Sequence, residues 1–317
     1  MKNVLVIGGT GFVGTQVCQR LVAQGWRVSV PTRRRAHAGG LQFLPRLSVH
    51  ELDVHDPQAL ARLLPGHHAL VNLVAILHGT PAEFGRVHVE LVRSLAGACV
   101  AAGLRRVVHV SAIGADFSQP DAAPSLYLRS KSRGEALWAQ AAEGAALDLT
   151  MLRPSVIFGR RDKFLNVFAN LQAALPVLPL AGAQARFQPV WVQDVASAVL
   201  RCLQGSSVVG SPAALPAVVE ACGPEVFTLA ELVRLAGQLR GVNLGRGRPV
   251  LALPDWLARW QARLMEMAPG EPVMSRDNLD SMRVPNVASG TLPGLQALGI
   301  APSALRSVAQ AYLAGAR

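Results

Sequence analysis

The segment from Val4 to Gly14, VLVIGGTGFVG, constrains the fold of this chain more than any other stretch. It opens with four apolar residues, three of them β-branched, which is typical of a strand buried on both faces in a parallel sheet. Glycines follow at positions 8, 11 and 14, together with the amphipathic pattern of a helix. The segment therefore predicts a strand, a glycine turn and a helix in direct succession.

A turn of this kind can hold a pyrophosphate. Gly8 would permit the tight turn, Gly11 would let the backbone approach the phosphates, and Gly14 would let the helix pack closely on the strand. The start of the helix adds unpaired N–H groups and a positive dipole end. The spacing is G-x-x-G-x-x-G, so an ordinary glycine turn is the alternative, but the strand before and the helix after favour a dinucleotide site.

The second predicted strand, Arg27–Pro31, ends where a dinucleotide fold meets the adenosine ribose. NAD binding would place an acidic residue there, whereas this chain has three consecutive arginines from Arg33. Guanidinium groups suit a 2′-phosphate, so Arg33 and Arg34 predict that NADP(H) is preferred over NAD(H), with a basic surface loop as the alternative. Asp53 closes a third predicted strand and is expected to meet the adenine amino group or to cap a loop.

Strands and helices continue to alternate, with strands predicted at Ala69–Leu77 and Arg106–Ser111 and helices at Asp56–Leu64 and Phe84–Ala102. This alternation predicts an α/β fold, a Rossmann-type doubly wound parallel sheet. Ligands gather at the carboxyl ends of such strands, which makes Ser111 a candidate site residue.

Tyr127 and Lys131 form a Y-x-x-x-K pair near the start of a predicted helix, Tyr127–Ala142. Residues four apart lie on one helix face, so the ammonium is expected to lower the pKa of the phenol and make it a usable acid. The alternative is an exposed helix with an incidental tyrosine and lysine. Because the chain has only two tyrosines, a chance match is improbable.

Composition excludes several classes of protein. Half of the 317 residues are hydrophobic and 16% are charged, which indicates a globular chain. Scattered cysteines and the absence of ligand spacing argue against a metal site. The net charge of +11 comes mainly from dispersed arginines without interleaved aromatic residues, so no nucleic-acid binding is expected. Without an export signal or a long apolar run, a cytoplasmic location is expected.

Residues 1–156 are expected to form the NAD(P)-binding Rossmann domain, and residues 157–317 a smaller, mostly helical substrate or interaction domain. The segment 190–204 is expected to pack back on the first domain. Within the second, Asp255–Met267 is predicted to be a basic amphipathic helix with Trp256 and Trp260 on one face. We expect these tryptophans to fill the small domain's core; contact with a membrane or a partner protein is the alternative.

The glycine turn, Ser111 and the Tyr127/Lys131 pair resemble the short-chain dehydrogenase/reductase superfamily, in its extended or atypical, NAD-dependent epimerase/dehydratase-like branch. Further segments resemble bacterial relatives of the NADPH-binding accessory subunit of respiratory complex I: Val87–Glu90, His109–Asp116, Tyr127–Glu135, Leu152–Gly159 with Asp162 and Phe164, Phe187–Val195, Gly223–Glu225 and Ser275–Asn278. The resemblance covers nearly the whole chain.

The resemblance implies that Ser111, Tyr127 and Lys131 are catalytic. It implies a pyrophosphate site over Gly8–Gly14, a 2′-phosphate site at Arg33, adenine contacts at Asp53 and Val54, and nicotinamide contacts at Pro154–Val156. The full predicted cofactor set is Gly8, Thr10, Gly11, Phe12, Val13, Gly14, Arg33, Arg34, Asp53, Val54, Leu73, Val74, Ala75, Tyr127, Lys131, Pro154, Ser155 and Val156. Two departures concern the substrate side: His88 stands where extended reductases have asparagine, and Gly159–Arg161 replaces a proline-containing turn.

These observations favour an NADP(H)-binding oxidoreductase acting on a hydrophobic, quinone- or lipid-like small molecule. The first alternative is a non-catalytic NADPH-binding accessory or assembly protein of a respiratory or quinone-biosynthesis complex, peripheral to the inner membrane. A redox sensor that binds partners according to the NADPH/NADP⁺ ratio is a third possibility. The sequence leaves the oligomeric state open.

Overall fold

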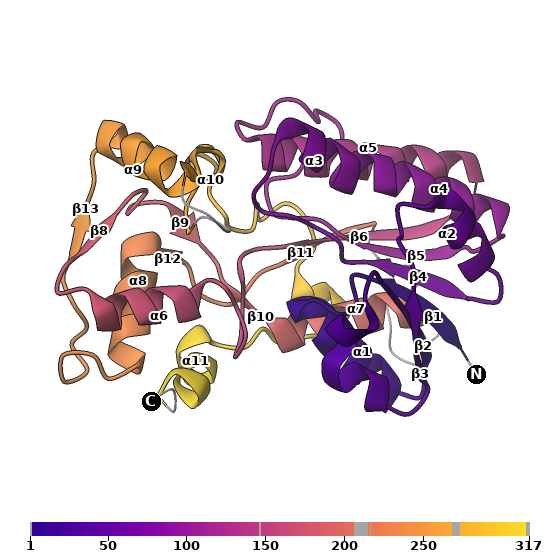
Figure 1. The fold of residues 1–317 in the computed structure, drawn as a ribbon, viewed down its shortest axis with the longest axis horizontal. Coiled ribbons are helices and arrows are strands. Elements are labelled where there is room, and N and C mark those ends of the chain that lie inside the picture. Colours follow the sequence, from indigo (N-terminus) through magenta and orange to yellow (C-terminus); the bar gives the residue numbers. More distant parts are fainter. Residues whose placement is uncertain (1, 146, 206–214, 216, 268–272, 315–317) are drawn as a thin grey trace. The chain divides into compact units, whose positions relative to one another are not determined.

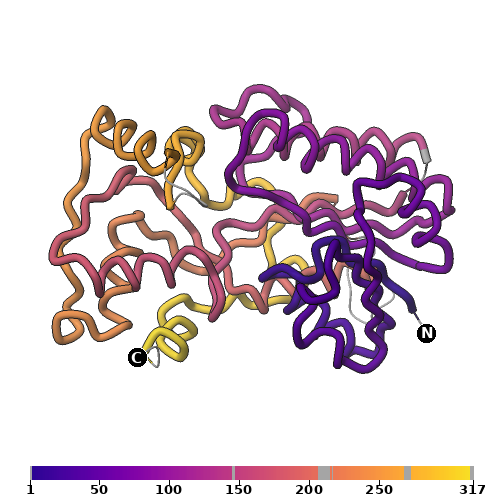
Figure 2. Tube along the Cα trace, viewed as in Figure 1, coloured from indigo at the N-terminus to yellow at the C-terminus, as the bar shows by residue number. Residues whose placement is uncertain are grey.

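The computed structural model describes residues 2–145, 147–205, 215, 217–267 and 273–314, and its chain forms two compact units (Figures 1 and 2). Unit 1 comprises Met1–Pro154, Gln193–Ala221 and Gly290–Ala301. Unit 2 comprises Ser155–Val192, Cys222–Ser289 and Pro302–Arg317. Each unit is therefore assembled from separate pieces of the chain.

Unit 1 is built on a seven-stranded parallel sheet with the order β11-β6-β5-β4-β1-β2-β3. Its strands are β1 (Asn3–Ile7), β2 (Arg27–Thr32), β3 (Leu47–Glu51), β4 (Ala69–Asn72), β5 (Arg106–Val110), β6 (Asp148–Pro154) and β11 (Val218–Ala221). The chain winds outward from β1 to β3 and returns to pair β4 with the other side of β1. The carboxyl ends of β1 and β4 thus flank the topological switch point, where ligands bind in such sheets.

Helices cover both faces of this sheet (Figure 1). One face carries α2 (Pro57–Leu63), α4 (Leu91–Ala101) and α5 (Leu126–Ala145), while α1 (Phe12–Ala23) and α7 (Val192–Gln204) lie on the other. The remaining helical segments of unit 1 are η1 (Arg35–Phe43), α3 (Pro81–Gly85), the π-helical η2 (Arg86–Glu90) and η4 (Leu295–Leu298). Burial on both faces explains why the strands are rich in valine, leucine and isoleucine.

Unit 2 is smaller and mainly helical, with short two-stranded pairings: β7 with β10, β9 with β12, and β8 with β13. Its strands are β7 (Ile157–Phe158), β8 (Leu178–Leu180), β9 (Arg186–Phe187), β10 (Val190–Trp191), β12 (Phe227–Thr228) and β13 (Val250–Ala252). Its helices are α6 (Leu165–Ala174), α8 (Leu229–Leu239), α9 (Asp255–Met267), α10 (Arg276–Ser281) and α11 (Leu305–Leu313). Helices α6, α8 and α11 enclose its main apolar core. The predicted fold class, with its smaller helical C-terminal part, is confirmed.

The unit boundaries differ from a simple division at residue 156. The sequence pattern places residues 290–301 in the second domain, whereas they belong to unit 1. The Glu220 N–H of β11 donates to the Pro293 carbonyl (2.8 Å), and Glu220 bridges to Gly294, so this segment adds to the edge of the large sheet. Residues 193–204 also belong to unit 1, whereas 190–192 remain with unit 2.

Helix α9 has the predicted bounds, but its tryptophans do not fill the core. Trp256 and Trp260 are 64% and 62% exposed. The buried side is made instead by Ala258 and Ala262, which pack with Ala181, Met274 and their neighbours in a small cluster. Small side chains on that face let the helix lie close to the rest of unit 2, and the bulky residues therefore face outward. Among the described residues, no helix is long and apolar enough to cross a bilayer.

Candidate functional site

The glycine turn after β1 has the geometry of a phosphate cradle. Gly8 has φ +81°, which favours glycine, and a Cβ at Gly14 would lie 2.2 Å from the Gly8 carbonyl oxygen. Helix α1 starts at Phe12 with Gly11 as its N-cap, and no side chain caps it. The first N–H groups of the helix therefore have no intrahelical partner and are open to an anionic ligand, which fits a pyrophosphate.

The segment after β4 lies against this turn. A Cβ on Gly8 would come within 3.2 Å of the Leu73 carbonyl carbon and the Val74 nitrogen. The Leu73 N–H donates to the Ile7 carbonyl (2.9 Å), which keeps the two strand ends together. The structure thus brings Leu73–Ala75 beside the glycine turn, at the switch point of the sheet.

Arg33 and Arg34 directly follow β2, and both are exposed. The structure also reveals an acidic neighbour that the sequence pattern of β2 does not show. Glu51 at the end of β3 stands in register with Thr32, and its carboxylate accepts the Arg35 N–H (2.9 Å). Only the parallel register of β2 and β3 places this carboxylate at the end of β2.

Asp53 and Val54 follow β3 in an ordered turn. One carboxylate oxygen of Asp53 accepts the His55 N–H (3.0 Å), and the Asp53 carbonyl accepts the Asp56 N–H (3.1 Å). Asp53 is exposed and Val54 is partly buried. Asp53 therefore caps its own loop through one carboxylate oxygen.

Strand β5 and helix α5 carry Ser111, Lys131 and Tyr127, and the end of β5 meets Lys131. Ser111 directly follows β5 and is buried, and its hydroxyl has no hydrogen-bond partner among the described residues. The Lys131 ammonium donates to the carbonyl of the preceding Val110 (2.9 Å) and is itself buried. Tyr127 lies one helical turn before Lys131 on α5. A buried hydroxyl left without a protein partner suits a hydrogen bond to a ligand.

Burial controls the protonation of this pair. It raises the pKa of Tyr127 to about 12 and lowers the pKa of Lys131 to about 8, with the Glu135 carboxylate opposing part of the second change. The Tyr127 pKa therefore moves in the direction opposite to the expected lowering by Lys131, and burial of the phenol is the cause of the change. Tyr127 stays protonated at neutral pH, as a proton donor must.

His88, in the π-helical η2, connects the segment after β4 with helix α5. Its Nε2 accepts the Ile76 N–H (3.1 Å), and its Nδ1 lies 2.7 Å from the Ser130 hydroxyl, which donates to the Tyr127 carbonyl (2.7 Å). Since the Ser130 hydrogen is used on Tyr127, we assign the histidine proton to Nδ1. Burial and then the Lys131 ammonium lower the pKa of His88 to about 3, which keeps the ring neutral. The sequence marks His88 only as a departure from asparagine.

The last predicted cofactor residues fall on both sides of the unit boundary. Pro154 ends β6 in unit 1, and its carbonyl accepts the Ile113 N–H (3.0 Å). Ser155 and Val156 begin unit 2, where the Ser155 hydroxyl and the Val156 N–H both donate to the Asn286 side-chain oxygen (2.6 and 2.8 Å). Asn286 thus fixes the backbone just after β6, a role no sequence motif indicates.

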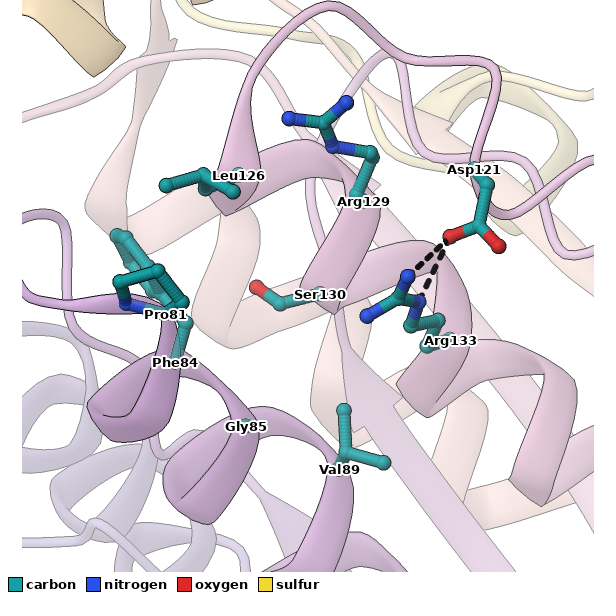
Figure 3. Close-up of a pocket in the computed structure, with 9 residues that line it drawn as sticks. All are labelled: Pro81, Phe84, Gly85, Val89, Asp121, Leu126, Arg129, Ser130 and Arg133. Atoms are coloured by element: carbon teal, nitrogen blue, oxygen red, sulfur yellow. Dashed lines mark hydrogen bonds and ion pairs between the residues drawn. The ribbon is translucent and has the colours of Figure 1, made fainter.

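A pocket of about 230 Å³ lies between α3, η2 and the first turns of α5 (Figure 3). Its rim carries an ion pair between Arg133 and Asp121 (2.7 Å), and Phe84 and Ser130 are among its lining residues. Neither Ser111, Tyr127 nor Lys131 lines it. The described residues contain no cluster of three histidine, cysteine or acidic side chains that could hold a metal ion.

The family model for the NAD-dependent epimerase/dehydratase family matches residues 4–214, which include the glycine turn, Ser111, Tyr127 and Lys131. The chain belongs to this family. Binding of a nicotinamide dinucleotide is typical of the epimerase/dehydratase family, and the turn at Gly8–Gly14 fits that ligand.

Relatives of the chain include a protein named as a subunit of an NADH dehydrogenase and one named as a ceramide reductase. The chain is 31% identical over 307 residues to the rat protein NADH dehydrogenase [ubiquinone] 1 alpha subcomplex subunit 9, mitochondrial, covering 95% of this chain and 76% of the relative. It is 32% identical over 200 residues to a ceramide reductase of Caulobacter vibrioides, covering 61% of this chain and 58% of the relative. The structure of UDP-glucose 4-epimerase from Thermus thermophilus with NAD has the same fold, with a TM-score of 0.66 and 20% identity over 99% of this chain and all of that one.

Proposed function

We propose that the chain is an NADP(H)-dependent oxidoreductase that acts on a hydrophobic, quinone- or lipid-like small molecule at Ser111, Tyr127 and Lys131. The observation that carries this function is the buried Ser111 hydroxyl without a described protein partner, next to the carbonyl that holds Lys131. The name of the Caulobacter relative, ceramide reductase, supports a reduction and a lipid-like substrate. The part of residues 157–317 that belongs to unit 2 is the substrate or interaction part of this proposal, and the proposed location of the protein is cytoplasmic.

Each side chain has a role set by its surroundings. In the reducing direction, the Ser111 hydroxyl donates a hydrogen bond to the substrate carbonyl oxygen, and Tyr127 transfers its phenolic proton to that oxygen. Lys131 holds the nicotinamide ribose and stabilises the tyrosinate left behind. The bound coenzyme supplies the hydride that reaches the carbonyl carbon. In the oxidising direction Tyr127 takes the proton back.

The charges after β2 support the proposed preference for NADP(H). Arg33 and Arg34 are exposed there, while the Glu51 carboxylate accepts the Arg35 N–H. Two guanidinium groups can pair with a 2′-phosphate, which carries the charge that distinguishes NADPH from NADH. We therefore assign the 2′-phosphate to Arg33, with Arg34 beside it.

Calorimetry of NADPH and NADH binding tests this assignment. We expect wild type to prefer NADPH. Arg33→Ala should lose about tenfold or more in NADPH affinity, because one charge-assisted hydrogen bond to the 2′-phosphate is removed. The matched control is Arg27→Ala, because Arg27 is exposed at the opposite end of the same strand. Equal binding of the two coenzymes by wild type would contradict the preference.

Turnover of lipid-like ketones and quinones by Tyr127→Phe then tests the catalytic role. We expect at least a hundredfold loss of turnover with a much smaller change in NADPH affinity, since the acid is lost while Lys131 and the glycine turn still hold the coenzyme. The control is Tyr312→Phe, which alters the other tyrosine of the chain, a donor to Asp162 in unit 2 (3.1 Å). Full turnover by Tyr127→Phe would exclude this tyrosine as the acid.

The rat relative, named as a subunit of an NADH dehydrogenase, supports a second candidate: an NADPH-binding accessory or assembly protein of a respiratory or quinone-biosynthesis complex, peripheral to the inner membrane. In that case the chain would co-purify with a large membrane complex, and Tyr127→Phe would support assembly as well as wild type does. The presence of Ser111, Tyr127 and Lys131 together favours the enzyme, because a purely structural site needs no acid.

A further inference from the structure

Helix α9 of unit 2 presents a bulky apolar face to solvent. Trp256, Trp260, Leu264 and Met267 are 64%, 62%, 62% and 77% exposed. At 100° per residue, these four side chains fall within an arc of about 80°. They therefore form one continuous stripe, which we call the α9 face.

Residues on either side of the helix in sequence extend the apolar character. Leu251 of β13 and Val273, which follows the helix, are both more than half exposed. Isolated exposed apolar residues are ordinary, but a contiguous group of this size marks an interaction surface. The opposite side of α9 is already occupied, since Ala258 and Ala262 pack on unit 2.

Arginines border the α9 face. Arg263 lies next to the tryptophans on the helical wheel, is exposed, and has no carboxylate partner among the described residues. Arg259 is one turn earlier on the same flank and pairs with Asp280 (3.0 Å). The chain as a whole carries a net charge of +11. An occupant of the α9 face must accept an apolar stripe and tolerate, or prefer, neighbouring positive charge.

We propose that the α9 face binds the surface of an anionic lipid bilayer, with α9 lying in the plane of the interface. Tryptophan prefers the boundary between headgroups and acyl chains, and a basic amphipathic helix binds there through its apolar stripe and its cations. The arginines on its flank meet the negative lipid phosphates. The helix lies on the membrane and does not cross it.

Charge separates this occupant from a second copy of the chain. Two copies joined through their α9 faces would bring Arg263 and Arg259 of each near those of the other, and both chains carry the same net charge of +11. An anionic lipid surface instead attracts Arg263 and the net positive charge of the chain, while Arg259 is already paired with Asp280. The proposed lipid contact is independent of the proposed oxidoreductase function, because it uses none of the residues of the nucleotide site.

Vesicle co-sedimentation of the full chain tests the proposal. We expect binding to vesicles of phosphatidylglycerol and phosphatidylcholine, weaker binding to phosphatidylcholine alone, and a loss of binding with added salt. The double variant Trp256→Gln/Trp260→Gln should bind at least about tenfold more weakly, because both apolar anchors are lost. Arg263→Gln should lose about fivefold on the anionic vesicles only.

The control variant is Phe43→Gln, which removes an aromatic side chain that is 81% exposed on unit 1 and should leave vesicle binding unchanged. All substituted side chains are exposed, so thermal unfolding and NADPH binding should match wild type. Lack of vesicle binding, or equal binding by the double variant, would refute the lipid contact. Self-association that the double variant abolishes, without vesicle binding, would assign the α9 face to a second copy instead.

Discussion

Lys131 and Tyr127 illustrate how a functional site can oppose stability. Both side chains are ionisable. Burial raises the pKa of Tyr127 and lowers the pKa of Lys131, so in each case it favours the neutral form. The ammonium of Lys131 has one backbone carbonyl as its hydrogen-bond acceptor. A lysine in such surroundings costs free energy of folding at neutral pH, and the proposed role in holding the coenzyme would give that charge a use.

Lys131→Met should therefore stabilise the protein while abolishing turnover. The folded-state pKa of about 8 lies below the ordinary value, so at pH 7 the charged form is buried at a cost of about 1 to 3 kcal/mol. Between about pH 8 and 10.5 the unfolded chain holds the proton that the folded chain has lost, so wild-type stability rises relative to the variant. Urea unfolding at pH 7 and 9.5 should show a gain for Lys131→Met that shrinks with pH. A loss at pH 7, or a gain that grows with pH, would contradict this explanation.

His88 shows why the site could be predicted only in part. The sequence makes Ser111, Tyr127 and Lys131 candidates because each stands in a recognisable motif. His88 makes its bonds to Ile76 and Ser130 from a buried position in a π-helical segment, and no local pattern indicates such a segment. Asn286 and Glu51 are similar, since each acts through a partner distant in sequence.

Most elements could be predicted from residue patterns, and the differences have local causes. The predicted strand 69–77 ends at Asn72, whose side-chain oxygen accepts the Val74 N–H (3.2 Å) and turns the chain out of the sheet. A capping box of Thr228 and Glu231, a pattern visible in the sequence, starts α8. For α9, the pattern gives the helix and its two faces, but which face is buried depends on the small side chains that its neighbours can accommodate.

The close contact between the glycine turn and α1 should make the position of α1 sensitive to any side chain at Gly14. Gly14→Ala would place a Cβ 2.2 Å from the Gly8 carbonyl oxygen, so α1 must move away from β1. We expect a loss of about 1 to 3 kcal/mol in the free energy of unfolding and at least a tenfold loss of NADPH affinity. Chemical denaturation and calorimetry measure the two effects.

The matched control for this variant is Gly97→Ala in α4. Position 97 is exposed and helical, and its Cβ would meet nothing within 4 Å. Removing a glycine from a helix interior there should stabilise the protein by about 0.5 to 1 kcal/mol without changing NADPH binding. If Gly14→Ala and Gly97→Ala have the same stability and the same NADPH affinity, close packing at Gly14 is not needed for the phosphate cradle.

At the scale of the whole molecule, the chain passes between the two units several times, so neither unit is a continuous stretch of sequence. The sequence pattern suggests a boundary near residue 156 because the regular alternation of strands and helices ends there. Helix α7 and strand β11 nevertheless return to complete the sheet of unit 1. The pairing of β11 with β6 joins residues far apart in the sequence, and the local periodicity of hydrophobic residues does not indicate such pairing.

A fragment of residues 1–156 should therefore fail to fold. It lacks β11 beside β6, and it lacks the buried side chains of α7, among them Val195, Val199 and Leu203. Each such side chain contributes about 1.5 to 3 kcal/mol when buried, so the loss approaches the whole stability of a typical domain, about 5 to 15 kcal/mol. The fragment would also leave Arg106 without its Cys202 carbonyl acceptor. Circular dichroism should show no cooperative unfolding for the fragment and a cooperative transition for the full chain; a fragment that unfolds cooperatively and binds NADPH would show that residues 1–156 form a domain by themselves.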